Sequence, residues 1–206
     1  MAQMQALYPD RFFYHCDRGS YDYVYGIEDL AELKGRKYQK KRNHVNKFRA
    51  LHPQYRVEPL SAETLPAATA MVEDWYAGRI QADPEGDYLM EKMALQKALT
   101  HYDDLGMETL VLLENDRVLA LTMASALSAD TMDVHFEKAR EDVDGAYPVI
   151  NMEFARYLRE KYPALLWLNR EEDMGLEGLR KAKESYYPHH LQEKCWAHLR
   201  EEEDDY

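Results

Sequence analysis

Three apolar runs between residues 107 and 139 constrain the fold more than any other part of this sequence. The runs METLVLLE, RVLALTMASAL and TMDVHFEKA follow one another with only short polar breaks. The pair Asn115-Asp116 between the first two runs is typical of a hairpin turn. Because strands joined by such short connections pair with their neighbours in antiparallel fashion, the block predicts a three-stranded meander.

The segments around the meander alternate between extended and helical patterns. Upstream we expect strands in RFFYHC and YDYVYGI, a short helix in IEDLAELKG, a basic helix over residues 36–51, a strand in YRVEPL, and helices to about Gly78 and over about 86–102. Downstream we expect a helix over about 146–161, a strand in LLWLN, a helix from Leu176 to Tyr187, and a last strand in LQEKCWAHL.

This order predicts an α+β (α/β) fold with a mixed, mostly antiparallel sheet flanked by helices. It is similar to the GNAT-like acyl-CoA N-acyltransferase fold. In that layout a helix leads from an antiparallel meander to a strand that splays from its neighbour, and the gap between the two strands holds the acyl donor.

The composition limits the cellular setting and the partners. The 206 residues carry a net charge of −12, so the chain as a whole is a poor binder of nucleic acid or of an anionic membrane surface. The two cysteines, Cys16 and Cys195, form no CxxC or Cys/His cluster, so neither a zinc site nor a disulfide framework is indicated. The apolar run Val118–Leu127 is too short to span a bilayer, and no signal peptide is visible, so we expect a cytoplasmic protein without membrane insertion.

One segment departs from this acidic character. Between Lys34 and Arg49 there are eight Lys or Arg residues and no Asp or Glu. Such a cluster attracts phosphates, and Lys40, Lys41 and Arg42 are the candidates for contacts to tRNA phosphates. The alternative is that this helix packs on the acidic remainder of the chain.

The strand TMDVHFEKA carries the candidate catalytic residues. Strict alternation places Asp133, His135 and Glu137 on one face of the strand. A histidine between two carboxylates can act as a general acid or base near neutral pH, so His135 and Glu137 are the predicted proton acceptors. The alternative is an ordinary solvent-exposed face.

Two helices contribute candidate binding residues. Asn151 lies at the edge of the apolar arc of the helix over 146–161, where it could donate to a substrate carbonyl or phosphate, or be a structural amide. In the helix after Gly175, Lys183 shares an arc with Leu179 and Tyr186. An inward lysine is costly unless it meets an anion, so Lys183 and Tyr186 are candidate substrate contacts. The alternative is a lysine that follows the helix edge towards solvent.

The segment after the LLWL strand concentrates both signs of charge. It holds Asn169, Arg170, Glu171, Glu172 and Asp173. Ligands of open α/β sheets collect at such strand ends. The acidic residues could bind an ammonium group and Arg170 a phosphate or carboxylate, or the charges could pair with one another.

The loop before the helix over 146–161 disfavours a CoA donor. A loop that wraps the pyrophosphate of CoA with backbone N–H groups is rich in glycine. Here the loop KAREDVDGAYPV has one glycine, Gly145, and three acidic residues.

Four segments together closely resemble the family of the phosphatidylglycerol lysyltransferase C-terminal domain, including its uncharacterised soluble members. They are LKGRKYQKKRNHVNKF, DVHFEKA, GAYPVINMEFA and LNREEDMGLEGLRKAKESYYP, and the resemblance runs from about Phe12 to about Ala197. It implies a GNAT-like fold related to the Fem-type aminoacyl transferases. Members commonly have two GNAT-like halves. The resemblance therefore implies that residues 53–200 form a GNAT-like domain and that residues 1–52 are N-terminal strands and a basic connecting helix left from a first half. The run EEEDDY at residues 201–206 is expected to be a solvated acidic tail.

The resemblance implies transfer of an acyl or aminoacyl group to a small-molecule amine or hydroxyl acceptor, with aminoacyl-tRNA as the donor. Such a reaction requires alignment, a proton acceptor and no covalent nucleophile, and the sequence offers no clear nucleophile. The alternatives are a CoA-dependent N-acetyltransferase using acetyl-CoA, and a non-catalytic half-enzyme that binds a ligand or partner. A homodimer could supply the missing half.

Overall fold

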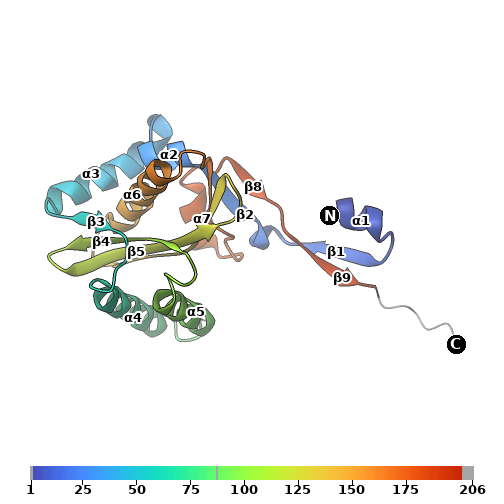
Figure 1. Ribbon diagram of the computed structural model, residues 1–206, viewed down its shortest axis with the longest axis horizontal. Coiled ribbons are helices and arrows are strands. Elements are labelled where there is room, and N and C mark those ends of the chain that lie inside the picture. The colour runs from blue at the N-terminus through green and yellow to red at the C-terminus, as the bar shows by residue number, and fades with distance from the viewer. Residues whose placement is uncertain (1, 87, 201–206) are drawn as a thin grey trace. The chain divides into compact units, whose positions relative to one another are not determined.

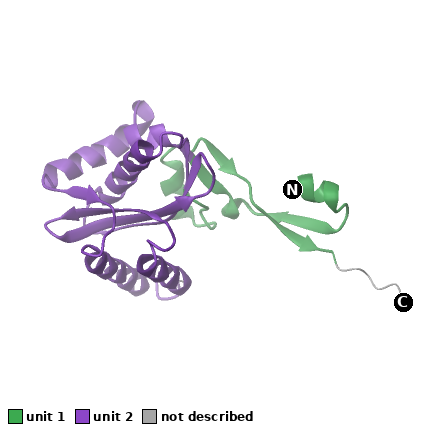
Figure 2. Cartoon of the chain, viewed as in Figure 1, with its two compact units in different colours: residues 1–24, 170–206 green, residues 25–169 purple. Residues whose placement is uncertain are grey.

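The computed structural model describes residues 2–86 and 88–200. The chain divides into two compact units, one of residues 1–24 with 170–206 and one of residues 25–169 (Figure 2). The first boundary falls inside strand β2 (Asp22–Gly26). The sequence analysis expects a domain boundary after residue 52, between a remnant of a first GNAT-like half and the GNAT-like domain. That boundary stays a prediction. The expected acidic tail lies outside the described residues.

The unit of residues 25–169 contains the predicted meander. Its strands lie in the order β3 (Arg56–Glu58), β4 (Glu108–Glu114), β5 (Arg117–Ala126), β6 (Thr131–Ala139) and β7 (Trp167–Asn169). Neighbours from β3 to β6 are antiparallel, whereas β7 runs parallel to β6 over only Thr131–Asp133. Asn115 and Asp116 adopt φ values of 48° and 63°, which a tight turn between twisted strands requires. The predicted mixed, mostly antiparallel GNAT-like layout is confirmed.

Helices cover both faces of this sheet (Figure 1). They are α2 (Ile27–Glu32), α3 (Gln39–Leu51), α4 (Leu65–Ala82), α5 (Leu89–Thr100) and α6 (Ala146–Lys161), with a short 3-10 helix η2 (Arg36–Tyr38) before α3. On one face α4 and α5 bury a cluster that includes Tyr76, Leu95, Leu121 and Met123. On the other face α6 packs against the meander strands, and α2 and α3 pack on α6. Of the helices in the described residues, none is both long enough and apolar enough to cross a membrane.

A β-bulge in β6 changes the direction of the side chains that follow it. The register pairs Ala124 with Val134 and Met123 with Phe136, so His135 is the extra residue. Phe136 therefore packs on the cluster under α4, while Glu137 turns to the α6 face and accepts a hydrogen bond there. The prediction that Glu137 shares a face with Asp133 and His135 is wrong, because strict alternation does not continue through a bulge.

The unit of residues 1–24 with 170–206 contains two separate strand pairs. Strand β1 (Phe12–Cys16) pairs antiparallel with β9 (Cys195–Leu199), and the first residues of β2 pair with β8 (His190–Gln192). Its helices are α1 (Ala2–Leu7), the 3-10 helix η1 (Arg18–Ser20) and α7 (Glu177–Glu184). The single strand predicted in LQEKCWAHL is thus two strands, separated at Glu193 and Lys194.

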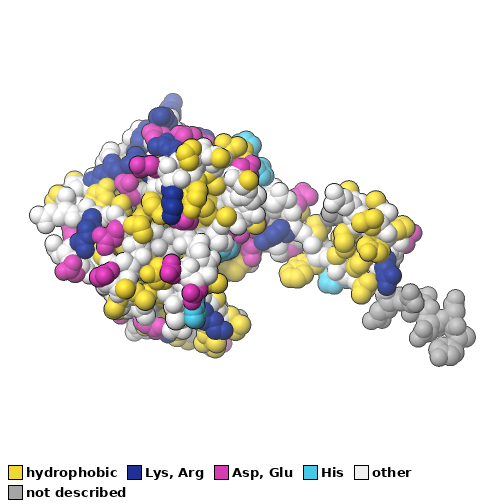
Figure 3. Space-filling view, viewed as in Figure 1, with side chains coloured by type: hydrophobic (Ala, Val, Ile, Leu, Met, Phe, Trp, Pro, Cys, Tyr) yellow, Lys and Arg dark blue, Asp and Glu magenta, His cyan; other side chains and the backbone are white. Residues whose placement is uncertain are grey.

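A disulfide joins Cys16 to Cys195 at the end of the β1–β9 ribbon. The sequence did not indicate this disulfide, because the two cysteines are 179 residues apart in sequence and only strand pairing brings them together. The ribbon itself is thinly packed: Phe13 is 48% and Trp196 66% exposed, and hydrophobic side chains gather on its surface (Figure 3). A two-stranded ribbon is marginally stable alone, so the disulfide stabilises the pairing of β1 with β9 where side-chain packing is sparse.

Candidate functional site

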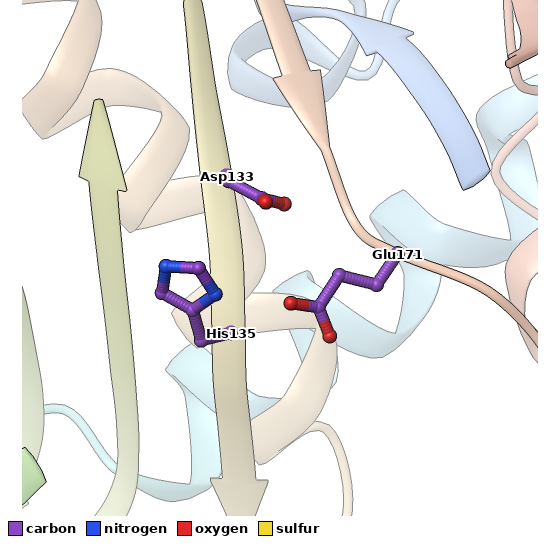
Figure 4. A group of neighbouring side chains, drawn as sticks. All are labelled: Asp133, His135 and Glu171. Atoms are coloured by element: carbon purple, nitrogen blue, oxygen red, sulfur yellow. The ribbon is translucent and has the colours of Figure 1, made fainter. Parts of the chain in front are cut away.

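His135 contacts a serine that the sequence did not reveal as a candidate. Ser125 Oγ, near the end of β5, lies 2.8 Å from His135 Nε2, and both side chains are half-buried. Asp133 is the register partner of Ser125 on β5 and of Asn169 on β7. Figure 4 shows Asp133 and His135 projecting from β6, and a carboxylate oxygen of Asp133 lies within 4.8 Å of a ring nitrogen of His135. The strand pairing thus assembles hydroxyl, imidazole and carboxylate from two adjacent strands.

Ser125 was missed because it lies in the apolar run RVLALTMASAL. Nothing in its immediate sequence distinguishes it from a serine in an ordinary strand. The relevant signal is the register between β5 and β6, which places Ser125 opposite Asp133. The bulge then brings His135 to the same place, and a bulge cannot be located from alternation alone.

Glu137 belongs to a separate polar group on the α6 face. Asn151 is 4% exposed, and its Nδ2 donates to Glu137 Oε2 at 3.2 Å. Thr122 is the register partner of Glu137. Within residues 2–86 and 88–200, Asn151 Oδ1 and Thr122 Oγ1 are buried without a hydrogen-bond partner. Each such atom costs about 1–3 kcal/mol if it stays unsatisfied, so this face suits a bound water or a polar ligand group.

Lys138, the residue after Glu137 on β6, is buried. Its side chain is 10% exposed, its Nζ lies 2.7 Å from Glu91 Oε1, and it lies 4.1 Å from the centroid of the Trp75 ring. Burial lowers the pKa of Lys138, and Glu91 opposes that shift. The ion pair and the aromatic face account for this lysine as a structural contact between β6 and helices α4 and α5.

Asp173 is fully buried, and donors from its own unit surround it. Arg18 Nη1, the Tyr23 hydroxyl and Arg180 Nε donate to Oδ2 at 3.3, 2.6 and 2.8 Å. The Gly175 backbone N–H and Arg180 Nη2 donate to Oδ1 at 2.8 and 3.0 Å. Arg180 above all, and then Tyr23 and Gly175, hold the pKa of Asp173 well below its usual range against the effect of burial. These contacts give Asp173 the geometry of a structural anchor.

The other candidates of this unit form a cluster next to that anchor. The Lys183 ammonium donates to the backbone carbonyls of Arg170 and Glu171 and lies 5.8 Å from the Tyr23 ring centroid. The Arg170 guanidinium lies 5.1 Å from the centroid of the Tyr186 ring, and Tyr186 is buried. Chain folding therefore brings Arg170, Glu171, Lys183 and Tyr186 together, with Lys183 directed at carbonyl oxygens.

Glu172 pairs within the same unit. Lys194 lies 2.5 Å from Glu172 Oε2 and 2.6 Å from Asp22 Oδ1. Burial alone lowers the pKa of Lys194, but hydrogen bonds to Asp22 and Glu172 outweigh it and raise that pKa. This lysine interrupts the predicted last strand, since it turns towards two carboxylates between β8 and β9.

The basic helix uses part of its charge internally. Arg42 donates to the carbonyls of Leu33 and Gly35 and to Gln39 Oε1, so it links α3 to the C-terminal end of α2. Lys40 is exposed and Lys41 half-buried. Of the three residues predicted to contact tRNA, Lys40 is therefore the most accessible.

The loop before α6 is held by the same basic helix. Lys47 lies 2.7 Å and His44 3.5 Å from the Asp144 carboxylate. Gly145 has a φ of 88°, and a Cβ there would lie 2.9 Å from the carbonyl oxygen of His44. Side chains of α3 thus contact the acidic residue that stands where a glycine-rich phosphate loop would be.

A pocket of about 270 Å³ lies elsewhere in the unit of residues 25–169. Tyr102, Met107, Glu108, Tyr157 and Lys161 are among its lining residues, and no predicted site residue is. Burial raises the pKa of Glu108, but hydrogen bonds from Lys161, Tyr162 and Tyr157 hold it below the usual value. His135 does not line this pocket, and its lining residues Glu108 and Lys161 pair with each other.

Comparisons with known proteins agree with this fold. The family model described as phosphatidylglycerol lysyltransferase, C-terminal, matches residues 2–198. A conserved protein of unknown function from Bacteroides thetaiotaomicron VPI-5482 is 39% identical, with a TM-score of 0.89 over 97% of this chain and 66% of that one. L-PGS from Bacillus licheniformis is 16% identical, with a TM-score of 0.66 over 97% and 65%.

A third solved structure is the C-terminal domain (DUF2156) of a proposed lysylphosphatidylglycerol synthetase from Agrobacterium fabrum. It is 13% identical, with a TM-score of 0.60 over 90% of this chain and 61% of that one. The chain therefore spans less than two thirds of the length of these three structures. Among curated proteins there was no match.

Proposed function

The chain belongs to the phosphatidylglycerol lysyltransferase C-terminal family, and from this premise we propose that it transfers an acyl or aminoacyl group to an amine or hydroxyl acceptor. The observation that carries the proposal is the contact between His135 and Ser125 at a bulge in β6. Bulges recur next to active sites, where they redirect a side chain. A half-buried imidazole at such a position can accept the proton that an attacking nucleophile loses.

The contacts favour His135 over Glu137 as the proton acceptor. Glu137 accepts from Asn151 on the α6 face, which the bulge separates from the face of His135. We propose that Glu137 and Asn151 instead bind a polar group of the substrate or a water, because Asn151 Oδ1 and the neighbouring Thr122 Oγ1 are buried without a partner among the described residues. Asn169, which ends β7 opposite Asp133, is proposed to support the same strand end.

Aminoacyl-tRNA is the proposed donor, since its ester is already activated. The family description names lysyl transfer, and the loop before α6 lacks the features of a CoA cradle. Arg170, Glu171, Glu172, Lys183 and Tyr186 are proposed contacts to charged groups of the donor or acceptor. Asp173 is not among these proposed substrate contacts, because its oxygens already accept five hydrogen bonds. Lys40 and Lys41 are proposed to meet tRNA phosphates.

The test is turnover of aminoacyl-tRNA. A pool of tRNA charged with radiolabelled amino acids is incubated with the protein, and loss of the ester and appearance of label in acceptors are followed. The acceptors supplied are free amino acids and phosphatidylglycerol vesicles. We expect wild-type protein to accelerate ester loss and His135→Asn to be slower by about 10²–10⁴-fold. Equal rates in both would refute the role of His135.

Two other outcomes identify the alternatives. Stabilisation by acetyl-CoA together with acetyl transfer to an amine would show a CoA-dependent N-acetyltransferase. A ligand at one hundred times its Kd stabilises a protein by about 2.7 kcal/mol, which a melting experiment resolves. Binding of tRNA without any turnover would show a non-catalytic module.

A further inference from the structure

We propose that Ser125 is a covalent nucleophile, which carries the acyl group as a serine ester between donor and acceptor while His135 serves as its base. This inference rests on the proposed function and adds a catalytic residue to it. It replaces the expectation, drawn from sequence, that the reaction proceeds without a covalent intermediate.

The geometry is that of an activated nucleophile. A serine hydroxyl is weakly nucleophilic unless an adjacent base lies within about 2.6–3.2 Å to take its proton. Ser125 Oγ lies 2.8 Å from His135 Nε2. A carboxylate also lies near the base, since an Asp133 carboxylate oxygen lies within 4.8 Å of a ring nitrogen of His135.

The partner of His135 distinguishes it from other histidines of the chain. His44, His52 and His101 each lie within 3.5 Å of a carboxylate oxygen. His135 lies 2.8 Å from a hydroxyl of the neighbouring strand, in addition to the Asp133 carboxylate nearby. The bulge produces this contact, because it inserts His135 as an extra residue beside the end of β5.

Ser125 is also placed where a substrate can reach it. Its side chain is half-buried, and the following residues 126–129 are exposed. Other hydroxyls nearby lack this combination. Thr122 is fully buried, and Ser128 Oγ donates to Asp130 Oδ1 at 2.7 Å.

The proposed reaction has two steps that balance. In the first, Ser125 Oγ attacks the carbonyl carbon of the donor ester while His135 takes the hydroxyl proton. The bond to the donor oxygen breaks, and His135 returns the proton to that oxygen, so that a serine ester and a free alcohol result. In the second, the acceptor amine or hydroxyl attacks the serine ester, His135 takes the acceptor proton, and Ser125 leaves as its hydroxyl with that proton.

The test uses p-nitrophenyl acetate as an activated ester, on the whole chain. Rapid mixing with wild-type protein is expected to release one p-nitrophenol per chain in a burst. Intact mass should rise by one acetyl group, and peptide mapping should place that group on Ser125. The variant Ser125→Ala should lose both burst and adduct. His135→Asn should acylate more slowly by about 10²–10⁴-fold, the usual contribution of a general base.

Two further variants keep the test decisive. Ser128→Ala removes a hydroxyl of the neighbouring turn and should behave as wild type. Ser125→Cys retains a nucleophile at the same place and should still be acylated, which covers the case that Ser125→Ala does not fold. Absence of an adduct in wild type, an adduct on another residue, or an unchanged burst in Ser125→Ala would overturn the proposal.

The same samples separate this inference from the proposed function. If aminoacyl-tRNA is turned over but no ester forms on Ser125 with either donor, the transferase function stands and the nucleophile is refuted. If p-nitrophenyl acetate acylates Ser125 but aminoacyl-tRNA is untouched, the nucleophile stands and the proposed donor is wrong.

Discussion

Arg180 donates hydrogen bonds to both carboxylate oxygens of Asp173, from Nε to Oδ2 at 2.8 Å and from Nη2 to Oδ1 at 3.0 Å. This paired geometry is the strongest form of an arginine–carboxylate contact. It lies in the segment whose mixed charges suggested a substrate site, and it shows that part of this charge holds the segment itself in place.

Asp173 should make stability depend on pH in the acid range. Its folded-state pKa is lowered, chiefly by Arg180, so in acid the unfolded chain binds the proton more readily than the folded chain. The stabilisation is therefore fully present above the unfolded-state pKa of about 4, and it is lost as the pH falls towards the lower folded-state pKa. Urea unfolding of wild type between pH 6 and pH 3 should show this loss, and Asp173→Asn should show less of it.

Near pH 7, Asp173→Asn should lower the free energy of unfolding by about 3 kcal/mol or less. Breaking a buried pair costs about 3–5 kcal/mol, and Arg18 and Arg180 are partly exposed, which reduces the cost of leaving them unpaired. Glu177→Gln is the matched control, because Glu177 pairs with Lys181 on the exposed side of α7. It should change stability by no more than about 0.5 kcal/mol. Equal effects of both variants would contradict the anchor role.

The backbone at Gly145 should tolerate no side chain. Gly145→Ala adds a Cβ at a φ of 88°, against the carbonyl oxygen of His44. A left-handed conformation alone costs a non-glycine residue about 1–2 kcal/mol, and the close contact adds to that. Gly78→Ala, in the middle of α4 with open space around it, should instead stabilise by about 0.5–1 kcal/mol. Urea unfolding measures both, and the same sign for the two changes would refute this explanation.

The disulfide should stabilise the chain through its unfolded state. It closes a loop of 179 residues, for which chain entropy gives a stabilisation of up to about 5 kcal/mol. Wild type treated with a reductant should therefore melt at a lower temperature than untreated wild type. The double variant Cys16→Ser and Cys195→Ser should melt at the same temperature as reduced wild type, and the reductant should not change its melting temperature. No change in wild type would mean that the pair does not form in solution.

Lys40 and Lys41 should contribute to tRNA binding through charge. The change of both to glutamate should weaken binding and reduce the slope of log affinity against log salt by about 0.7–0.9 for each phosphate that the protein no longer neutralises. Lys97→Glu on α5 is the control, because α5 covers the opposite face of the sheet and Lys97 is exposed. A filter-binding titration at several salt concentrations checks this. Equal losses of affinity per unit of charge changed in the two proteins would show a general charge effect and no tRNA binding at α3.

The sequence predicted those parts of the fold that short-range patterns control. The turn at Asn115-Asp116 and the helix Ala146–Lys161 lie where pattern and turn chemistry placed them. Pairings between distant segments were beyond its reach. Cys16 meets Cys195 only through strand pairing, and Asp173 meets Tyr23 across 150 residues.

The candidate site was predictable in the same uneven way. His135 was proposed from the sequence because a histidine between acidic residues is conspicuous on a strand. Ser125 was missed because only the register between β5 and β6 places it opposite Asp133. Glu137 was placed on the wrong face because a single inserted residue at the bulge reverses the side chains of β6 beyond it. Register and bulges are set by the neighbouring strand, so they cannot be derived from one strand alone.

The central claim is that His135 drives transfer of an activated acyl group, and the most direct measurement is the rate of ester loss from aminoacyl-tRNA with wild-type protein, with His135→Asn and with Ser128→Ala. We predict rapid loss with wild type and Ser128→Ala, and a rate lower by about 10²-fold or more with His135→Asn. Indistinguishable rates for all three proteins, or no acceleration above the protein-free control, would contradict the claim.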